Sequence, residues 1–183
     1  MDLILVRHGQ TDWNLQGRWQ GQADPSLNAT GIAQAQAAAD ALCADEFAAL
    51  YSSDLKRAWE TADQIAALKH LTILPEPRLR EINLGAWQGM FSPDIRAQYP
   101  QEFQQWHNAP LYAHPPGGED LRALIARVLA ALADLRARHS GEQICVVAHE
   151  LPIAVIRCHA AALPFEHLRE FIPANGSITR VKG

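Results

Sequence analysis

The chain of 183 residues is long enough to bury one substantial core and short enough to form a single domain. Hydrophobic residues make up 48% and charged residues 20%, a balance typical of globular rather than disordered proteins. The net charge of −4 argues against a nucleic-acid partner, because surfaces that bind nucleic acid are basic. No apolar stretch approaches the roughly 20 residues that span a bilayer, and no secretory signal is visible, so we expect a cytoplasmic protein without a membrane partner.

The first predicted element is a buried strand over residues 3–6, where four aliphatic residues precede Arg7. Such continuous apolar runs are typical of strands covered by helices on both faces of a parallel sheet. A polar stretch leads to a predicted helix over residues 31–44, which Thr30 is placed to cap. Residues 48–52 then predict a second, short strand. The chain therefore begins as strand, helix, strand.

The middle of the chain contains one further helix, one strand and an irregular stretch. The helix opens at residues 53–54 and presents an apolar face through residue 66, and residues 71–74 predict a third strand. Between residues 85 and 118 the pattern becomes irregular and includes five prolines. This stretch is too long for an ordinary connection, so we expect a small lid around residues 86–117.

The last third of the chain repeats the alternation of helix and strand. A long helix is predicted from residue 121, and residues 144–148 form a second strongly apolar strand. A helix over residues 152–162 follows, and a final pair of strands is expected near Phe171 and over residues 178–181. The sequence therefore predicts an α/β protein with a mostly parallel sheet.

Both strongly apolar strands lead into a histidine. Residues 3–6 precede Arg7 and His8, and residues 144–148 precede His149. Because the carboxyl ends of parallel strands meet at one edge of a sheet, where α/β proteins bind ligands, these side chains are expected to share one crevice. Two imidazoles beside a guanidinium suit the capture of an anion and nucleophilic attack on it.

Four motifs, in a fixed order, carry a resemblance to a known family. They are R-H-G-Q-T-D-W-N-L-Q-G-R-W-Q-G from Arg7, S-D-L-K-R-A-W-E-T-A from Ser53, L-R-E-I-N-L-G-A-W-Q-G from Leu79, and V-V-A-H ending at His149. On these motifs the chain resembles the histidine phosphatase superfamily, in its phosphoglycerate mutase-like branch. The resemblance implies a three-layer αβα sandwich around the mostly parallel sheet, with residues 1–183 forming one domain.

The same resemblance implies roles for the residues in these motifs. His8 would be the nucleophile that takes the phosphoryl group, which requires a neutral imidazole, and nearby guanidinium groups disfavour its protonation. Arg7, Arg57 and His149 would clamp the phosphoryl oxygens, where transition-state charge is spread. Arg57 is also expected in the first turn of its helix, where the helix N-terminus favours anions.

Glu81 is the candidate general acid and base. A carboxyl group beside a bound phosphate has its pKa raised by like-charge repulsion, so it can hold a proton near neutrality. The alternative for Glu81 is an exposed ion pair with Arg80 or Arg78.

The resemblance also indicates which residues contact the substrate and whether a cofactor is needed. By family analogy Asn14, Gln20 and Gly21 contact the substrate, and no cofactor is implied. No metal site is expected either, because the remaining histidines lack the spacing of metal ligands.

Glu150 is a departure from the family pattern, in which glycine commonly follows the second histidine. A carboxylate here is expected either to repel a dianion and limit the approach of the backbone, or to bind a cationic or hydroxyl part of the substrate. The presence of Glu150 leaves the substrate class and the catalytic efficiency open, but it does not affect the type of reaction that is expected.

The leading hypothesis is a metal-independent phosphatase that hydrolyses small organic phosphomonoesters through phosphohistidine. The alternatives are a phosphoglycerate mutase, a ribazole phosphate phosphatase of cobalamin synthesis, and a non-catalytic scaffold that binds phosphorylated ligands. Hydrolysis is favoured because only Arg96 is strongly basic in the lid, whereas a mutase must hold a second anionic group. The aromatic side chains of the lid either line the substrate pocket or pack the lid onto the domain. The partner is a small phosphorylated metabolite, and the oligomeric state is left open, a homodimer included.

Overall fold

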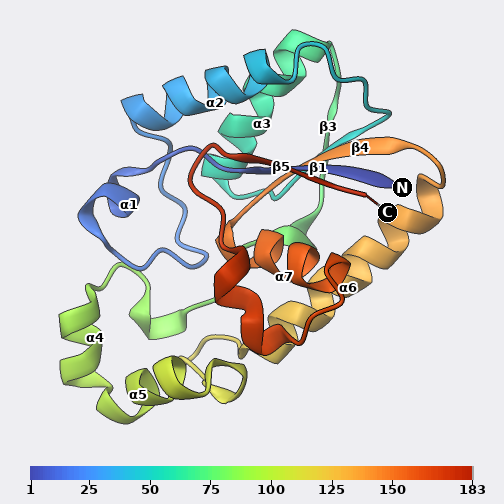
Figure 1. Ribbon diagram of the computed structural model, residues 1–183. Coiled ribbons are helices and arrows are strands. Elements are labelled where there is room, and N and C mark those ends of the chain that lie inside the picture. Colours follow the sequence, from blue (N-terminus) through green and yellow to red (C-terminus); the bar gives the residue numbers. More distant parts are fainter. Residues whose placement is uncertain (183) are drawn as a thin grey trace.

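The computed structural model describes residues 1–182 and contains a five-stranded sheet with the strand order β3-β2-β4-β1-β5 (Figure 1). The first four of these strands run parallel, and β5 pairs with β1 in the antiparallel direction. The mostly parallel sheet predicted from the sequence is confirmed. In chain order the strands are β1 (Asp2–Arg7), β2 (Leu50–Ser52), β3 (Ile73–Pro75), β4 (Gln143–Ala148) and β5 (Ile178–Val181).

Helices cover both faces of this sheet, as the αβα expectation requires. In Figure 1, α2 and α3 lie over one face, and α6 and α7 lie over the other. The α-helices are α1 (Asp12–Gln16), α2 (Ala29–Ala41), α3 (Lys56–Lys69), α4 (Ser92–Gln98), α5 (Pro100–Asn108), α6 (Leu121–Arg138) and α7 (Glu150–Ala160). Short 3₁₀ helices are η1 (Pro77–Leu79), η2 (Gly85–Trp87), η3 (Pro110–Tyr112) and η4 (Phe165–Phe171).

The central strand β1 shows why its sequence is apolar throughout. Ile4 and Val6 belong to the core beneath α2 and α3, whereas Leu3 and Leu5 belong to the core beneath α6 and α7. Successive side chains of a strand point to opposite faces, so a strand covered on both faces must be apolar at every position. Strand β4 is likewise apolar and buried on both faces, and β1 and β4 lie side by side in the middle of the sheet.

Two helix starts differ from the sequence predictions. Helix α2 begins at Ala29 because the side chain of Asn28, not of Thr30, accepts the backbone N–H of Gly31 and caps the helix. Helix α3 begins at Lys56, because the backbone N–H of Ser53 donates to Val147 of β4 (3.0 Å) and so continues the sheet. The second difference keeps Ser53 beside β4.

The lid segment (residues 86–117) was expected to be irregular but folds into α4, α5 and η3. Ile95 and Phe103 of this segment are buried in the core shared with α6 and α7. Helices α4 and α5 each carry a proline in the first turn, where the missing N–H costs no hydrogen bond. Three of the five prolines that suggested irregular chain, Pro93, Pro100 and Pro110, therefore mark helix starts.

The strand expected near Phe171 is absent from the part of the chain that the structure describes. Residues 165–171 form η4 instead, bounded by Pro164 and followed by Pro173. Arg157 of α7 donates to the carbonyl oxygen of Phe171 (2.6 Å), which holds this 3₁₀ segment against α7 rather than in the sheet.

Among residues 1–182, none of the helices combines the length and the apolar character that a membrane-spanning helix requires.

Candidate active site

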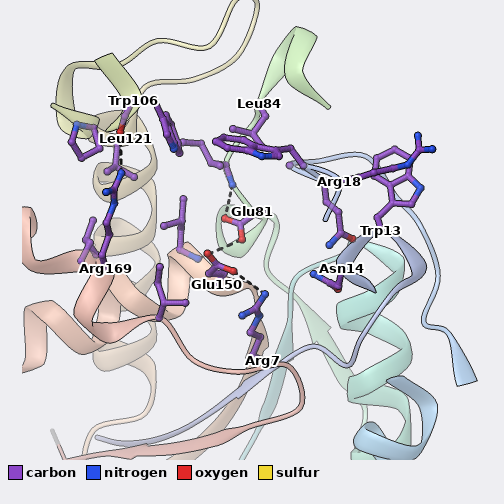
Figure 2. A pocket seen from close by; sticks show the side chains of 18 of the residues that line it. Arg7, Trp13, Asn14, Arg18, Glu81, Leu84, Trp106, Leu121, Glu150 and Arg169 are labelled. Carbon is purple, nitrogen blue, oxygen red and sulfur yellow. Dashed lines mark hydrogen bonds and ion pairs between the residues drawn. The ribbon is translucent and has the colours of Figure 1, made fainter. Parts of the chain in front are cut away.

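A cleft of about 540 Å³ opens at the carboxyl ends of β1 and β4 (Figure 2). This is the edge of the sheet at which the sequence predicted the crevice. Eight of the nine predicted site residues line the cleft: Arg7, His8, Asn14, Gln20, Gly21, Arg57, Glu81 and Glu150. The ninth, His149, is fully buried behind them, and its ring centroid lies 5.1 Å from that of His8.

His8 is buried, with 2% of its surface exposed, and both ring nitrogens have partners. Its Nδ1 lies 2.7 Å from the carbonyl oxygen of Gly9, and since a carbonyl only accepts, Nδ1 carries the proton. Nε2 then holds a lone pair, which accepts the Nε–H of Arg57 at 3.2 Å. Burial, and secondly the charges of Arg57 and Arg7, hold the pKa of His8 well below its usual value. The imidazole is therefore neutral and nucleophilic at Nε2.

Arg57 projects from the first turn of α3, as predicted, and only 1% of it is exposed. Its two Nη groups donate to the carbonyl oxygens of Ala23 and Gly21, both at 2.7 Å. Burial lowers its pKa to about 10, so the guanidinium stays charged near neutrality. The backbone carbonyls therefore fix this cation against His8.

Two buried nitrogens of the site have no hydrogen-bond partner. Among residues 1–182 only three buried side-chain nitrogens or oxygens lack one, and these are Arg7 Nε, His149 Nδ1 and Trp87 Nε1. The rest of Arg7 is engaged, because it donates to the carbonyl oxygen of Pro173 and forms an ion pair with Glu150 (2.8 Å). Buried polar groups are nearly always paired, so unpaired ones beside a nucleophile indicate a place for ligand oxygens.

Glu81 lies in the same cleft, on a loop between η1 and η2 (Figure 2). Its carboxylate accepts the N–H of Ile82 at 2.9 Å and of Leu151 at 3.4 Å. Burial, and secondly the charge of Glu150, raise its pKa to about 7, while Arg57 and Arg7 oppose this shift. Glu81 is therefore poised to hold or release a proton near neutrality.

The structure does not form the ion pairs that were the alternative for Glu81. Arg80 pairs with Asp54, and Arg78 pairs with Glu76 and Asp134. The carboxyl group of Glu81 is left facing the cleft.

Arg127 of α6, which the sequence analysis did not single out, holds the loop that carries Glu81. Its guanidinium donates to the carbonyl oxygens of Arg78 and Arg80, both at 2.7 Å, and of Glu81 at 2.9 Å. It is also ion-paired with Glu119, whose carboxylate accepts the N–H of Asn83 at 2.8 Å. Arg127 thus satisfies three backbone carbonyls of this segment, and Gln22 Nε2 also donates to the carbonyl oxygen of Glu81 (3.0 Å).

The predicted substrate-side residues line the cleft together with His8. Asn14 and Thr11 form a capping box at the start of α1, and the Thr11 hydroxyl donates to the Gln20 side chain at 2.9 Å. Gly21 has a φ of +53°, and a Cβ there would lie 2.7 Å from the side chain of Gln88, so a larger residue would strain this turn. Local hydrogen bonds therefore preset these residues.

Comparison with known proteins decides the family. The sequence model of a protein family, described as the histidine phosphatase superfamily (branch 1), matches residues 3–183. The chain belongs to the histidine phosphatase superfamily. It is 38% identical to phosphoserine phosphatase 1 of Hydrogenobacter thermophilus over 156 residues, covering 85% of this chain and 74% of that protein.

Solved structures agree with this assignment. A putative α-ribazole-5′-P phosphatase from Escherichia coli has a TM-score of 0.92 at 29% identity, covering 98% of this chain and 89% of that one. Mycobacterial glucosyl-3-phosphoglycerate phosphatase has a TM-score of 0.89 at 34% identity, covering 100% of this chain and 91% of that one. The phosphoglycerate mutase-like α/β fold is confirmed, and this histidine phosphatase is an enzyme that hydrolyses phosphomonoesters.

The outer part of the phosphatase cleft contains residues that sequence reasoning missed. Four of them come from or follow η4, where a strand had been expected: Phe165, Leu168, Arg169 and Ile172. Of the aromatic side chains proposed for the lid, Trp106 lines the cleft, whereas Phe103 is buried in the core and Tyr112 is 62% exposed. Trp106 and Tyr99 also pack against the core that contains Phe103, so Trp106 serves both purposes.

Replacement of Glu150 by glutamine is predicted to lower the pKa of Glu81 from about 7 toward the usual 4.5. The change removes a negative charge that disfavours ionisation of Glu81, and it frees Arg7 to favour ionisation. Carbon-13 NMR titration of labelled glutamate side chains measures the shift.

Glu166→Gln is the matched control, because Glu166 also lines the cleft but is not a source of the Glu81 shift. An unchanged Glu81 pKa in Glu150→Gln, or equal changes in both variants, would contradict this electrostatic coupling.

Proposed function

We propose that this phosphatase hydrolyses small organic phosphomonoesters through a phosphohistidine intermediate on His8, without a metal or cofactor. The observation that carries the proposal is the pair of unpartnered buried donors, Arg7 Nε and His149 Nδ1, beside the neutral imidazole of His8. Preorganised donors of this kind stabilise charge on phosphoryl oxygens in the transition state. Two guanidinium groups supply the positive charge that a metal ion provides in other phosphatases.

In the first step the phosphoryl group binds between Arg7, Arg57 and His149. The lone pair of His8 Nε2 attacks phosphorus while the bond from phosphorus to the alcohol oxygen breaks. The Nε–H of Arg57, which donates to that lone pair in the resting site, then donates to an oxygen of the phosphoryl group that has entered beside it. The reaction thus uncovers the nucleophile and neutralises the anion with the same cation.

Glu81 moves the protons in both steps. With a pKa of about 7 it is protonated in a large fraction of molecules and donates its proton to the departing alcohol oxygen. The carboxylate then takes a proton from the water that attacks phosphohistidine, and the bond from phosphorus to nitrogen breaks. His8 regains its lone pair and Glu81 its proton, which closes the cycle.

The cleft supports an organic alcohol as the leaving group. Its inner end carries Asn14, Gln20, Gly21 and Glu150, which we assign to substrate binding. Its outer end combines apolar side chains, such as Trp106, Phe165 and Leu168, with the charged side chains of Glu166 and Arg169. The relatives named above act on phosphoserine, glucosyl-3-phosphoglycerate and α-ribazole-5′-P, and these three phosphomonoesters are the first substrates to test here.

A phosphoglycerate mutase is the competing activity. It must hold a second anionic group of its substrate. Arg96 of the lid segment does not line the cleft, which leaves Arg18 and Arg169 as the lining arginines outside the phosphoryl site. A non-catalytic scaffold is disfavoured because His8 and Glu81 face the same cleft with the ionisation states that catalysis needs. Hydrolysis is the activity that the site supports best.

We further propose the setting in which the enzyme works. Residues 1–183 form one domain in which the lid segment closes over the substrate. The protein is cytoplasmic, with a small phosphorylated metabolite as its partner and with neither nucleic acid nor membrane. Sedimentation of the full chain decides between a monomer and a homodimer.

His8→Ala is predicted to lower the hydrolysis of p-nitrophenyl phosphate by at least about 10³-fold, because the phosphoryl acceptor is lost. Release of p-nitrophenolate in the presence of a chelator measures it. His107→Ala, a histidine of the outer cleft, is the control and should retain activity.

Normal turnover by a folded His8→Ala variant would contradict the mechanism, and loss of wild-type turnover with chelator would contradict metal independence. Transfer of phosphate from 3-phosphoglycerate, with a trace of bisphosphoglycerate, would favour the mutase.

Glu81→Gln is predicted to slow the hydrolysis of alkyl phosphates by about 10²- to 10⁴-fold but of p-nitrophenyl phosphate much less, because a good leaving group needs no proton. In the wild type, kcat/KM for an alkyl phosphate should fall as the pH rises above about 7, where Glu81 loses the proton that it donates. Steady-state rates for a leaving-group series measure both effects. Equal slowing of all substrates would count against Glu81 as the acid.

A further inference from the structure

Ser53 is a buried residue that takes no part in the catalytic steps described above. It follows β2 and is fully enclosed, with 0% of its surface exposed. Its hydroxyl oxygen lies 2.8 Å from Nε2 of His149, which follows the neighbouring strand β4. The adjacency of β2 and β4 in the sheet brings the two side chains together.

The direction of this hydrogen bond follows from the other partners of Ser53. Its Oγ accepts the backbone N–H of Leu55 at 3.3 Å, so that contact does not use the hydroxyl proton. Among the described residues, His149 Nε2 is the one acceptor that the hydroxyl proton reaches. The hydroxyl therefore donates to Nε2, which must hold a lone pair.

This bond determines the tautomer of His149. Burial, and secondly the charge of Arg57, hold the pKa of His149 well below its usual value, so the ring is neutral and has one N–H. With the lone pair on Nε2, the hydrogen resides on Nδ1. That atom is one of the unpartnered buried donors of the described chain.

We propose that Ser53 is a positioning residue, which holds His149 in the tautomer that presents Nδ1–H to a phosphoryl oxygen. This rests on the proposed function and adds to it the source of the donor. A neutral imidazole is an acceptor at one nitrogen and a donor at the other, so the wrong tautomer would turn a lone pair toward the anion. The serine removes that outcome before the substrate arrives.

Ser53→Ala tests the proposal, with Ser52→Ala as the matched control. Ser52 is equally buried and adjacent in the chain, but its hydroxyl donates to the backbone carbonyl of Ser53 (2.8 Å) and not to a histidine. Both variants lose one buried hydroxyl, and only Ser53→Ala removes the partner of His149. A general loss of packing should affect the two alike.

Two measurements on the full-length protein separate a positioning role from a structural one. Nitrogen-15 NMR of labelled histidine, with His149→Gln to assign the signal, reports which ring nitrogen carries hydrogen. In Ser53→Ala we expect the ring hydrogen of His149 to move from Nδ1 to Nε2. We also expect the inhibition constant for inorganic phosphate to rise about 10- to 100-fold, which corresponds to the loss of one hydrogen bond to a charged group. In Ser52→Ala we expect the wild-type tautomer and an inhibition constant within about twofold.

The proposal is overturned if His149 of Ser53→Ala keeps hydrogen on Nδ1 with unchanged phosphate inhibition, or if both variants weaken phosphate equally. If Ser53→Ala does not fold, Ser53→Gly also removes the hydroxyl, and an unaltered tautomer and inhibition constant there would overturn the proposal. The NMR result does not depend on turnover, so it stands apart from a failure of the proposed function, which would appear as wild-type hydrolysis that does not need His8.

Discussion

Arg7 Nε and His149 Nδ1 are buried donors without partners, and they flank the neutral imidazole of His8. A buried donor left unpaired costs about 1–3 kcal/mol, so a fold keeps such groups only where something else justifies them. In the mechanism that we propose, that justification is the phosphoryl group, whose oxygens accept both hydrogens. The unpaired donors therefore link the stability of the resting protein to its chemistry.

The rest of the molecule serves to hold these groups in place. Strands β1 and β4 are buried on both faces and end at Arg7 and Ala148, so the residues that follow them emerge at one rigid edge. Backbone carbonyls fix Arg57, and Arg127 fixes the loop that carries Glu81. Glu150, where the family commonly has glycine, pairs with Arg7 and raises the pKa of Glu81.

Much of the fold and of the candidate site could be predicted from the sequence, because both depend on local patterns. Apolar runs revealed β1 and β4, and the motifs that begin at Arg7, Ser53 and Leu79 identified residues that the structure brings into one cleft. The lid segment was mistaken for irregular chain because its prolines were taken as breaks and not as helix starts. The outer cleft was missed because η4 packs on α7 through long-range contacts that no local pattern reveals.

The central claim is that His8 Nε2 takes the phosphoryl group from the substrate. Rapid acid-free quenching of the enzyme during turnover of a phosphorus-32-labelled substrate, followed by peptide mapping, tests it most directly. We predict an acid-labile, alkali-stable label on the peptide that contains His8, attached at Nε2. Label on a carboxylate or hydroxyl side chain, or on another histidine, would contradict the account.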